Sequence, residues 1–150
     1  MEKRLSALNY ALKLLSYRGR SERELINRLS IKGYSDEEIK KSLEELKDIG
    51  LIDDRKIALD FKNYAKETKK LGSMGIRNFL LSRGIPIDVI EEICDDNDEE
   101  EDAYELIQKR IRNLEDEKAK KRIYSLLQRR GYSFETIRKV LRRFYNEEVS

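Results

Sequence analysis

The chain has 150 residues, of which 41% are charged and 39% apolar, and its formal net charge is only +2. This length suits one domain or a short array of repeats, and the balanced charge argues against disorder, which requires low hydrophobicity and high net charge. No apolar run reaches the roughly 18 residues of a membrane helix, and the one cysteine, Cys94, allows no intrachain disulfide. We therefore expect a cytoplasmic protein with no membrane partner.

Apolar residues spaced three or four apart predict helices along the whole chain, with no convincing strand. In the first helix, four leucines at positions 5, 8, 12 and 15 form the expected apolar face. A capping box from Ser21 to Glu24 opens the second helix, and Asp53 is expected to cap the helix that carries Ile57 and Phe61. Further helical faces lie within residues 72–82, 104–114 and 123–127.

A repeated pattern surrounds three glycines, Gly33, Gly84 and Gly131. Each has a leucine four positions before it and apolar residues six and ten positions after it. Glycine adopts the left-handed conformation that ends a helix without steric cost, and a serine or proline two positions later opens the next helix. Each glycine therefore marks a corner between two helices.

The glycines lie 51 and 47 residues apart, which is the length of a three-helix unit. We predict an all-α fold of three tandem three-helix repeats, each with a corner like that of a helix-turn-helix. The expected division is repeat 1 at residues 1–52, repeat 2 at 53–94, an acidic linker at 95–102, and a basic repeat 3 at 103–150. The linker holds seven acidic residues in eight positions, which repel one another and favour a solvated segment.

No motif for catalysis is apparent. The sequence contains no histidine, so it lacks the usual general base near neutral pH and the commonest metal ligand. Cys94 is expected on an apolar face as a buried structural thiol, and residues 72–75 lack the lysine of a phosphate-binding loop. The acidic run lacks the glycine and the final glutamate of a calcium loop. We predict no catalytic residue, no cofactor and no metal.

Basic residues are concentrated near the C-terminal end. Residues 103–150 hold 13 basic and 7 acidic residues. Such a stripe presents positive charge to an anionic partner, although a solvated helix face would explain it equally well. The candidate partner-binding residues are Lys118, Lys120, Lys121, Arg122, Arg129, Arg130, Arg138, Lys139, Arg142 and Arg143. Weaker candidates in the second repeat are Lys69, Lys70, Arg77 and Arg83.

Several of these motifs resemble those of the RecX family. The string Gly50-Leu51-Ile52-Asp53-Asp54 lies at the family's distance between two glycine corners, and Ala58 and Phe61 follow it. The resemblance covers nearly the whole chain and is strongest over residues 21–85. One position departs from the family pattern, because Gly75 stands where a basic residue is usual.

The resemblance implies an elongated, curved array of three repeats that binds the RecA–DNA filament without being an enzyme. Family members usually restrain filament growth, ATP hydrolysis, strand exchange and cleavage of the LexA repressor. They thereby act in homologous recombination, DNA repair and the SOS response. The implied partners are RecA and, weakly and non-specifically, single- or double-stranded DNA, and we expect a monomer.

Two other functions stay open from the residues alone. A stand-alone DNA-binding module would use the helix after a glycine corner to enter a groove of DNA. Asp36, Glu37 and Glu38 follow the first corner, however, and would repel phosphate. A metal-dependent nuclease using the acidic run is the third hypothesis, and no second motif supports it.

Overall fold

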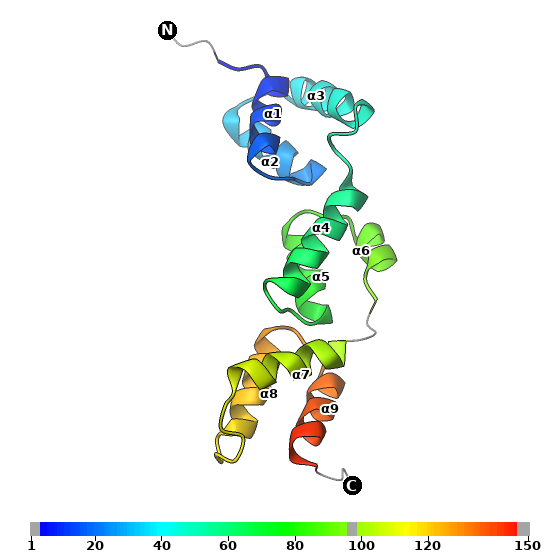
Figure 1. Cartoon of the computed structure of the whole chain (residues 1–150). Helices are drawn as coiled ribbons and strands as arrows, with labels where there is room; N and C mark the ends of the chain where they lie inside the picture. Colours follow the sequence, from blue (N-terminus) through cyan, green and yellow to red (C-terminus); the bar gives the residue numbers. More distant parts are fainter. Residues whose placement is uncertain (1–3, 96–98, 147–150) are drawn as a thin grey trace. The chain divides into compact units, whose positions relative to one another are not determined.

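The computed structural model describes residues 4–95 and 99–146, and over these residues it is entirely helical (Figure 1). The prediction of an all-helical chain built of three-helix repeats is confirmed. In chain order the helices are α1 (Ala7–Tyr17), α2 (Glu22–Lys32), α3 (Asp36–Asp48), α4 (Asp54–Glu67), α5 (Ser73–Ser82), α6 (Ile87–Ile93), α7 (Glu99–Arg110), α8 (Ala119–Arg129) and α9 (Phe134–Tyr145).

The three predicted glycine corners have the same backbone geometry. Gly33, Gly84 and Gly131 have φ angles of 100°, 81° and 81°, in the left-handed region. In each corner the N–H after the glycine donates to the carbonyl of the leucine four positions before it, at 3.0–3.1 Å. Because these carbonyls end the preceding helix, this bond closes a Schellman motif. The repeated leucines are therefore both corner acceptors and fully buried core residues.

The predicted helix caps are also present. Ser21 and Glu24 form the complete capping box at the start of α2, and Ser35 accepts from the backbone of Glu38 at the start of α3. Asp53 accepts from the backbone of Arg55 and Lys56 at the start of α4, at 3.1 and 3.2 Å. These caps bind N–H groups that have no partner within the helix, so local sequence sets the helix boundaries.

The buried face of α1 differs from the predicted one. Leu5 and Leu12 are exposed, while Ala7, Ala11 and Leu14 are buried where α1 packs against α2 and α3. Alanine allows helix backbones to approach closely, so the small side chains occupy the centre of the interface. The bulkier Leu8 and Leu15 lie half-buried at its edge.

The chain packs as two compact units whose limits differ from the predicted repeats. Unit 1 combines α1–α3 with the start of α4, the end of α5, and α6. Unit 2 combines the end of α4 and the start of α5 with α7–α9. The boundaries fall between residues 61 and 62, 79 and 80, and 93 and 94. The repeats are a division of the sequence pattern and not of the packing, and we still propose their limits at residues 52, 94 and 102.

Within each unit, a glycine corner docks on the beginning of a helix from the preceding repeat. In unit 1, the buried Ser21 hydroxyl at the start of α2 donates to the carbonyl of Arg83 at 2.5 Å. In unit 2, the Gly72 N–H before α5 donates to the carbonyl of Arg130 at 2.8 Å. Both joints unite the N–H end of one helix with the carbonyl end of another, which aligns their dipoles favourably. Each joint lies inside one unit, which is why the units cut across the repeats.

Half of the acidic segment predicted over residues 95–102 is helical. Residues 99–102 form the first turn of α7, while residues 96–98 lie outside the described residues. Carboxylates are favoured in the first turn of a helix, because they interact with its positive end. The same charges that suggested a solvated linker therefore stabilise the start of a helix.

None of the helices in the described ranges is long and apolar enough to cross a membrane. Cys94 lies one residue beyond α6 and is half-buried, so the prediction of a fully buried thiol on the face of that helix is wrong. The helix ends at Ile93, so Cys94 does not continue its buried face.

Candidate functional site

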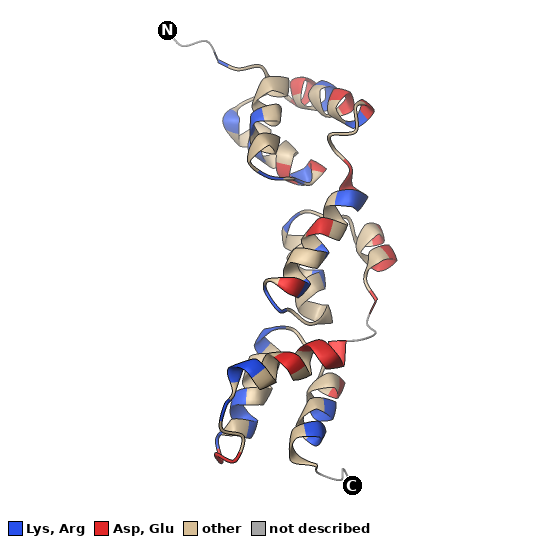
Figure 2. Cartoon of the chain, viewed as in Figure 1, with Lys and Arg blue, Asp and Glu red and all other residues tan. Residues whose placement is uncertain are grey.

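The third repeat contains a groove lined by positively charged side chains. It has a volume of about 560 Å³ and lies along α8 beside the end of α7. Its lining residues include no carboxylate. Figure 2 shows basic residues along α8 and acidic residues at the start of α7. The lining consists of Arg110, Ile111, Lys118, Lys121, Arg122, Ser125, Leu126 and Arg129. We call this surface the cationic groove.

The periodicity of α8 produces this surface. Lys121, Ser125 and Arg129 are spaced four residues apart, so their side chains line one face. Ala119, Ile123 and Leu127 follow the same spacing and are fully buried. Ile123 and Leu127 belong to one buried cluster with apolar residues of α7 and α9, which fixes the rotation of α8 and leaves the first row exposed.

The start of α8 is chemically unusual within this chain. No acidic residue occupies its first turn, and the residue before it, Lys118, makes no side-chain cap. The connection before the helix compensates in part, because Asp116 accepts from the Lys118 N–H at 3.0 Å and pairs with Arg122 at 3.3 Å. Cations at the start of a helix lie near the positive end of its dipole, so their placement lowers stability.

The predicted stripe on α9 is partly neutralised by neighbouring carboxylates. Arg143 forms ion pairs with Glu100 at 3.1 Å and Glu101 at 2.6 Å, and its guanidinium lies 3.8 Å from the centre of the Tyr104 ring. The hydrogen bond that the Arg143 guanidinium donates to Glu101 raises the pKa of Arg143 above its ordinary value. Lys139 pairs with Glu135 at 3.5 Å.

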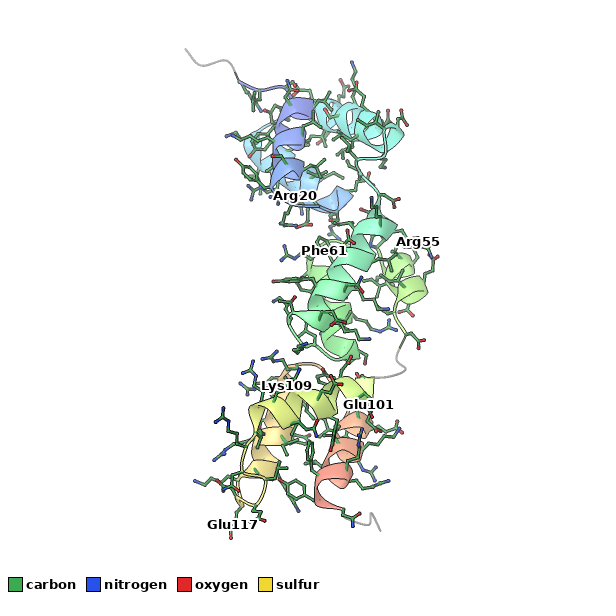
Figure 3. All side chains as sticks on the ribbon, viewed as in Figure 1. Arg20, Arg55, Phe61, Glu101, Lys109 and Glu117 are labelled. Carbon is green, nitrogen blue, oxygen red and sulfur yellow. The ribbon has the colours of Figure 1, made fainter. Side chains whose placement is uncertain are left out.

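All four cations of α9 are exposed, but Arg138 and Arg142 form no ion pair with the described residues. The Arg138 guanidinium lies 5.8 Å from the centre of the Phe134 ring. The predicted partner-binding residues of the third repeat therefore separate into the groove on α8, this exposed pair on α9, and residues engaged by their own fold. Figure 3 shows all of these side chains, with Lys109 labelled near the end of α7, Glu101 near its start and Glu117 before α8.

Several other candidates contact the protein itself. The Arg130 guanidinium donates to the carbonyl of Lys69, and the Lys70 carbonyl accepts from the Tyr132 hydroxyl at 3.2 Å. Lys120 lies 4.8 Å from the centre of the Tyr145 ring. These contacts assign Arg130 a structural role at the joint of unit 2.

The weaker candidates of the second repeat are also engaged. Arg83 pairs with Glu24 at 3.7 Å and lies 5.7 Å from the centre of the Phe61 ring. Lys69 lies 5.3 Å from the centre of the Phe79 ring. Arg77 is half-buried and interacts with the rest of the protein. These cations are thus less available to a partner than those of the cationic groove.

Sequence reasoning missed the role of Glu99. Its carboxylate accepts from the Ser73 N–H at 2.8 Å, the Ser133 N–H at 3.0 Å and the Thr136 hydroxyl at 2.5 Å. Burial alone would raise its pKa, but these hydrogen bonds outweigh burial, so the pKa of Glu99 lies below its ordinary value. One side chain thereby caps the beginnings of both α5 and α9. The only sequence signal was a glutamate preceding a predicted helix.

The described residues offer no arrangement for metal chemistry. None of their acidic and thiol side chains form a group of three that could hold a metal ion. Glu99, which lies in the acidic run compared above with a calcium loop, already accepts the three hydrogen bonds described above. What the site can offer is a row of exposed positive charges.

Comparison with family models matches residues 7–46 to the first three-helix domain of RecX and residues 98–141 to the third. A regulatory protein RecX from Chlorobaculum tepidum is 32% identical over 148 residues, covering 97% of this chain and 92% of that protein. A regulatory protein RecX from Clostridium botulinum is 32% identical over 146 residues, covering 92% of this chain and 68% of that protein. The crystal structure of RecX from Lactobacillus salivarius superposes with a TM-score of 0.80 at 22% identity, covering 94% of this chain and 96% of that one.

Proposed function

This chain is a member of the RecX family, and from that premise we propose that it regulates recombination and repair by binding the RecA–DNA filament. The observation that carries the proposal is that the match to proteins named regulatory protein RecX extends over 97% of the chain. Bound to the filament, the protein restrains ATP hydrolysis, strand exchange and coprotease activity, and it acts in the cytoplasm. It does so by occupancy rather than by catalysis.

The charge distribution supports this proposal. A filament that exposes DNA phosphate and acidic side chains attracts a positively charged surface. The cationic groove and the pair Arg138 and Arg142 supply such surfaces in the third repeat. Regulation by occupancy requires only that these surfaces be exposed, which they are. It requires no general base, nucleophile or metal.

A stand-alone DNA-binding module is the second candidate. Its supporting observation is that each glycine corner joins two helices as a helix-turn-helix does. The helix after the first corner, α3, begins with the exposed acidic residues Asp36, Glu37 and Glu38, which would face phosphate. Tight, sequence-dependent binding to duplex DNA without RecA would favour this candidate.

Binding to RecA filaments tests the proposed function directly. Filaments assembled on single-stranded DNA are sedimented with increasing amounts of this protein, and we expect saturable co-sedimentation. A chain that stays in the supernatant at every concentration would contradict the proposal.

The double charge reversal Arg138→Glu and Arg142→Glu is expected to weaken inhibition of RecA. Both side chains are exposed on α9, so their reversal introduces repulsion with an anionic filament without disturbing the core. We expect at least a fivefold higher concentration for half-inhibition of ATP hydrolysis, with unchanged helicity by circular dichroism. This corresponds to about 1 kcal/mol of lost binding free energy.

The matched control reverses Lys13 and Lys41, which are exposed on α1 and α3. It makes the same change in net charge elsewhere and is expected to alter half-inhibition less than twofold. Equal weakening by both double variants would indicate a non-specific charge effect. Unaltered inhibition by the α9 variant would remove Arg138 and Arg142 from the proposed surface.

A further inference from the structure

The cationic groove carries more positive charge than the described residues balance, because they supply it with one ion pair. Five of its eight lining residues are basic and none is acidic. Among its cations, Arg122 forms an ion pair with Asp116, and within the described ranges the Arg129 guanidinium donates to one backbone carbonyl, that of Ser125 at 3.3 Å. By contrast, Glu100 and Glu101 reach Arg143 on α9. The groove therefore gathers like charges that an anionic ligand would stabilise.

The sequence maintains these cations against the preference of the helix. The first turn of α2 contains Glu22 and Glu24, and that of α3 contains three acidic residues. The first turns of α1 and α5 contain no acidic residue and are uncharged, whereas the first turn of α8 is basic. Positions where local stability is sacrificed without structural compensation are typical of functional surfaces. Asp116 compensates only part of this repulsion, because it reaches a single cation of the groove.

The shape and chemistry of the groove identify the class of ligand. From Lys118 to Arg129 the row extends for about 16 Å along the helix, because each residue of a helix adds about 1.5 Å. A row of this length fits several phosphates of one strand and exceeds a single small anion. The lining contains no Asn or Gln, which are typical readers of base edges, and Ser125 is its one uncharged polar residue.

We propose that the cationic groove of α7 and α8 binds the phosphodiester backbone of nucleic acid, independently of base sequence and without RecA. This inference rests on the proposed function, because it assigns contact with the DNA of the filament to one surface of this protein. The cations of the lining contact phosphate, and its apolar side chains, Ile111 and Leu126, are available to the sugars. The exposed pair on α9 is not part of this contact.

The test uses the full-length protein and a fluorescent oligothymidine, with binding followed by anisotropy between low and moderate salt. The variant is Lys118→Glu with Lys121→Glu, two exposed residues of the groove. We expect at least a tenfold loss of affinity at low salt. Loss of two phosphate contacts also lowers the slope of log affinity against log salt by about 1.4. The melting temperature is expected to stay the same or rise, because carboxylates are favoured at the start of a helix.

Two matched controls locate the effect. Lys13→Glu with Lys41→Glu makes the same charge change on unit 1 and is expected to change affinity less than twofold. Arg138→Glu with Arg142→Glu stays in the third repeat and is expected to leave most of the affinity. Unchanged affinity and salt slope in the Lys118 and Lys121 variant would overturn the proposal, as would a wild-type protein that binds no oligonucleotide at low salt.

Competition identifies the ligand. Duplex DNA and single strands of mixed sequence are expected to compete in proportion to their phosphate, while polyglutamate competes poorly. Displacement by polyglutamate at an equal charge concentration would instead indicate an acidic protein partner and overturn the phosphodiester assignment. Because RecA is absent from this assay, oligonucleotide binding can be retained when filament regulation fails, so the two proposals fail separately.

Discussion

Replacing Gly131 with alanine is expected to lower the free energy of unfolding by about 3 kcal/mol. Gly131 has a φ of 81°, where an alanine costs about 1–2 kcal/mol because of its Cβ. That Cβ would lie 2.2 Å from the backbone nitrogen of Gly75 and 2.5 Å from its Cα. Backbone atoms cannot rotate away, so the joint of unit 2 must open, with a further cost of about 1–3 kcal/mol. Urea denaturation followed by circular dichroism measures the loss.

Gly50→Ala is the matched control for this prediction. Gly50 has a similar φ of 76°, but no heavy atom lies within 4 Å of the added Cβ. We expect the conformational cost alone, about 1–2 kcal/mol. The difference between the two variants therefore measures the close approach at the joint. Equal losses would contradict the docking of the Gly131 corner on the start of α5.

Replacing Glu99 with alanine is expected to destabilise the protein by about 2–4 kcal/mol. The substitution removes the acceptor of three hydrogen bonds, from the Ser73 and Ser133 N–H groups and the Thr136 hydroxyl. Each buried donor left without a partner costs about 1–3 kcal/mol, although water reaches this half-buried position and reduces the sum. Glu105→Ala, at an exposed position of the same helix, is expected to change stability by no more than about 0.5 kcal/mol. Equal losses in the two variants would show that Glu99 does not hold α5 and α9.

The same carboxylate gives a signature in the pH dependence of stability. The hydrogen bonds lower the pKa of Glu99 in the folded state, so the folded protein binds fewer protons here than the unfolded chain. Its contribution is therefore complete above the unfolded pKa of about 4.3 and is lost as the pH falls through the lower folded pKa. Glu99→Gln should reduce the loss of unfolding free energy as the pH falls through this range, whereas Glu105→Gln should leave that loss unchanged. An identical acid limb for wild type and Glu99→Gln would contradict the shift.

Local features of the structure were predictable from sequence because local chemistry determines them. A glycine that ends a helix and a serine that begins one act within a few residues, so corners at Gly33, Gly84 and Gly131 follow from spacing alone. The face that α1 buries did not follow, because the leucine pattern does not show how closely α2 and α3 approach Ala7 and Ala11.

The joints and the site depend on long-range placement, which explains what sequence reasoning missed. Glu99 acquires its role only when Ser73 and Ser133, separated by 60 positions in the sequence, lie beside the start of α7. Likewise, the basic residues of α8 and α9 look equivalent in the sequence. They differ because carboxylates at the start of α7 reach Arg143, whereas none lines the groove of α8.

The most direct test of the central claim is the rate of ATP hydrolysis by RecA on single-stranded DNA, measured against increasing amounts of this protein. RecA from the same organism should be used. A regulator that occupies the filament is expected to lower the rate at amounts well below one molecule per RecA protomer. An unchanged rate at every ratio, together with direct binding to DNA in a shift assay, would contradict the proposed function and favour the stand-alone DNA-binding module.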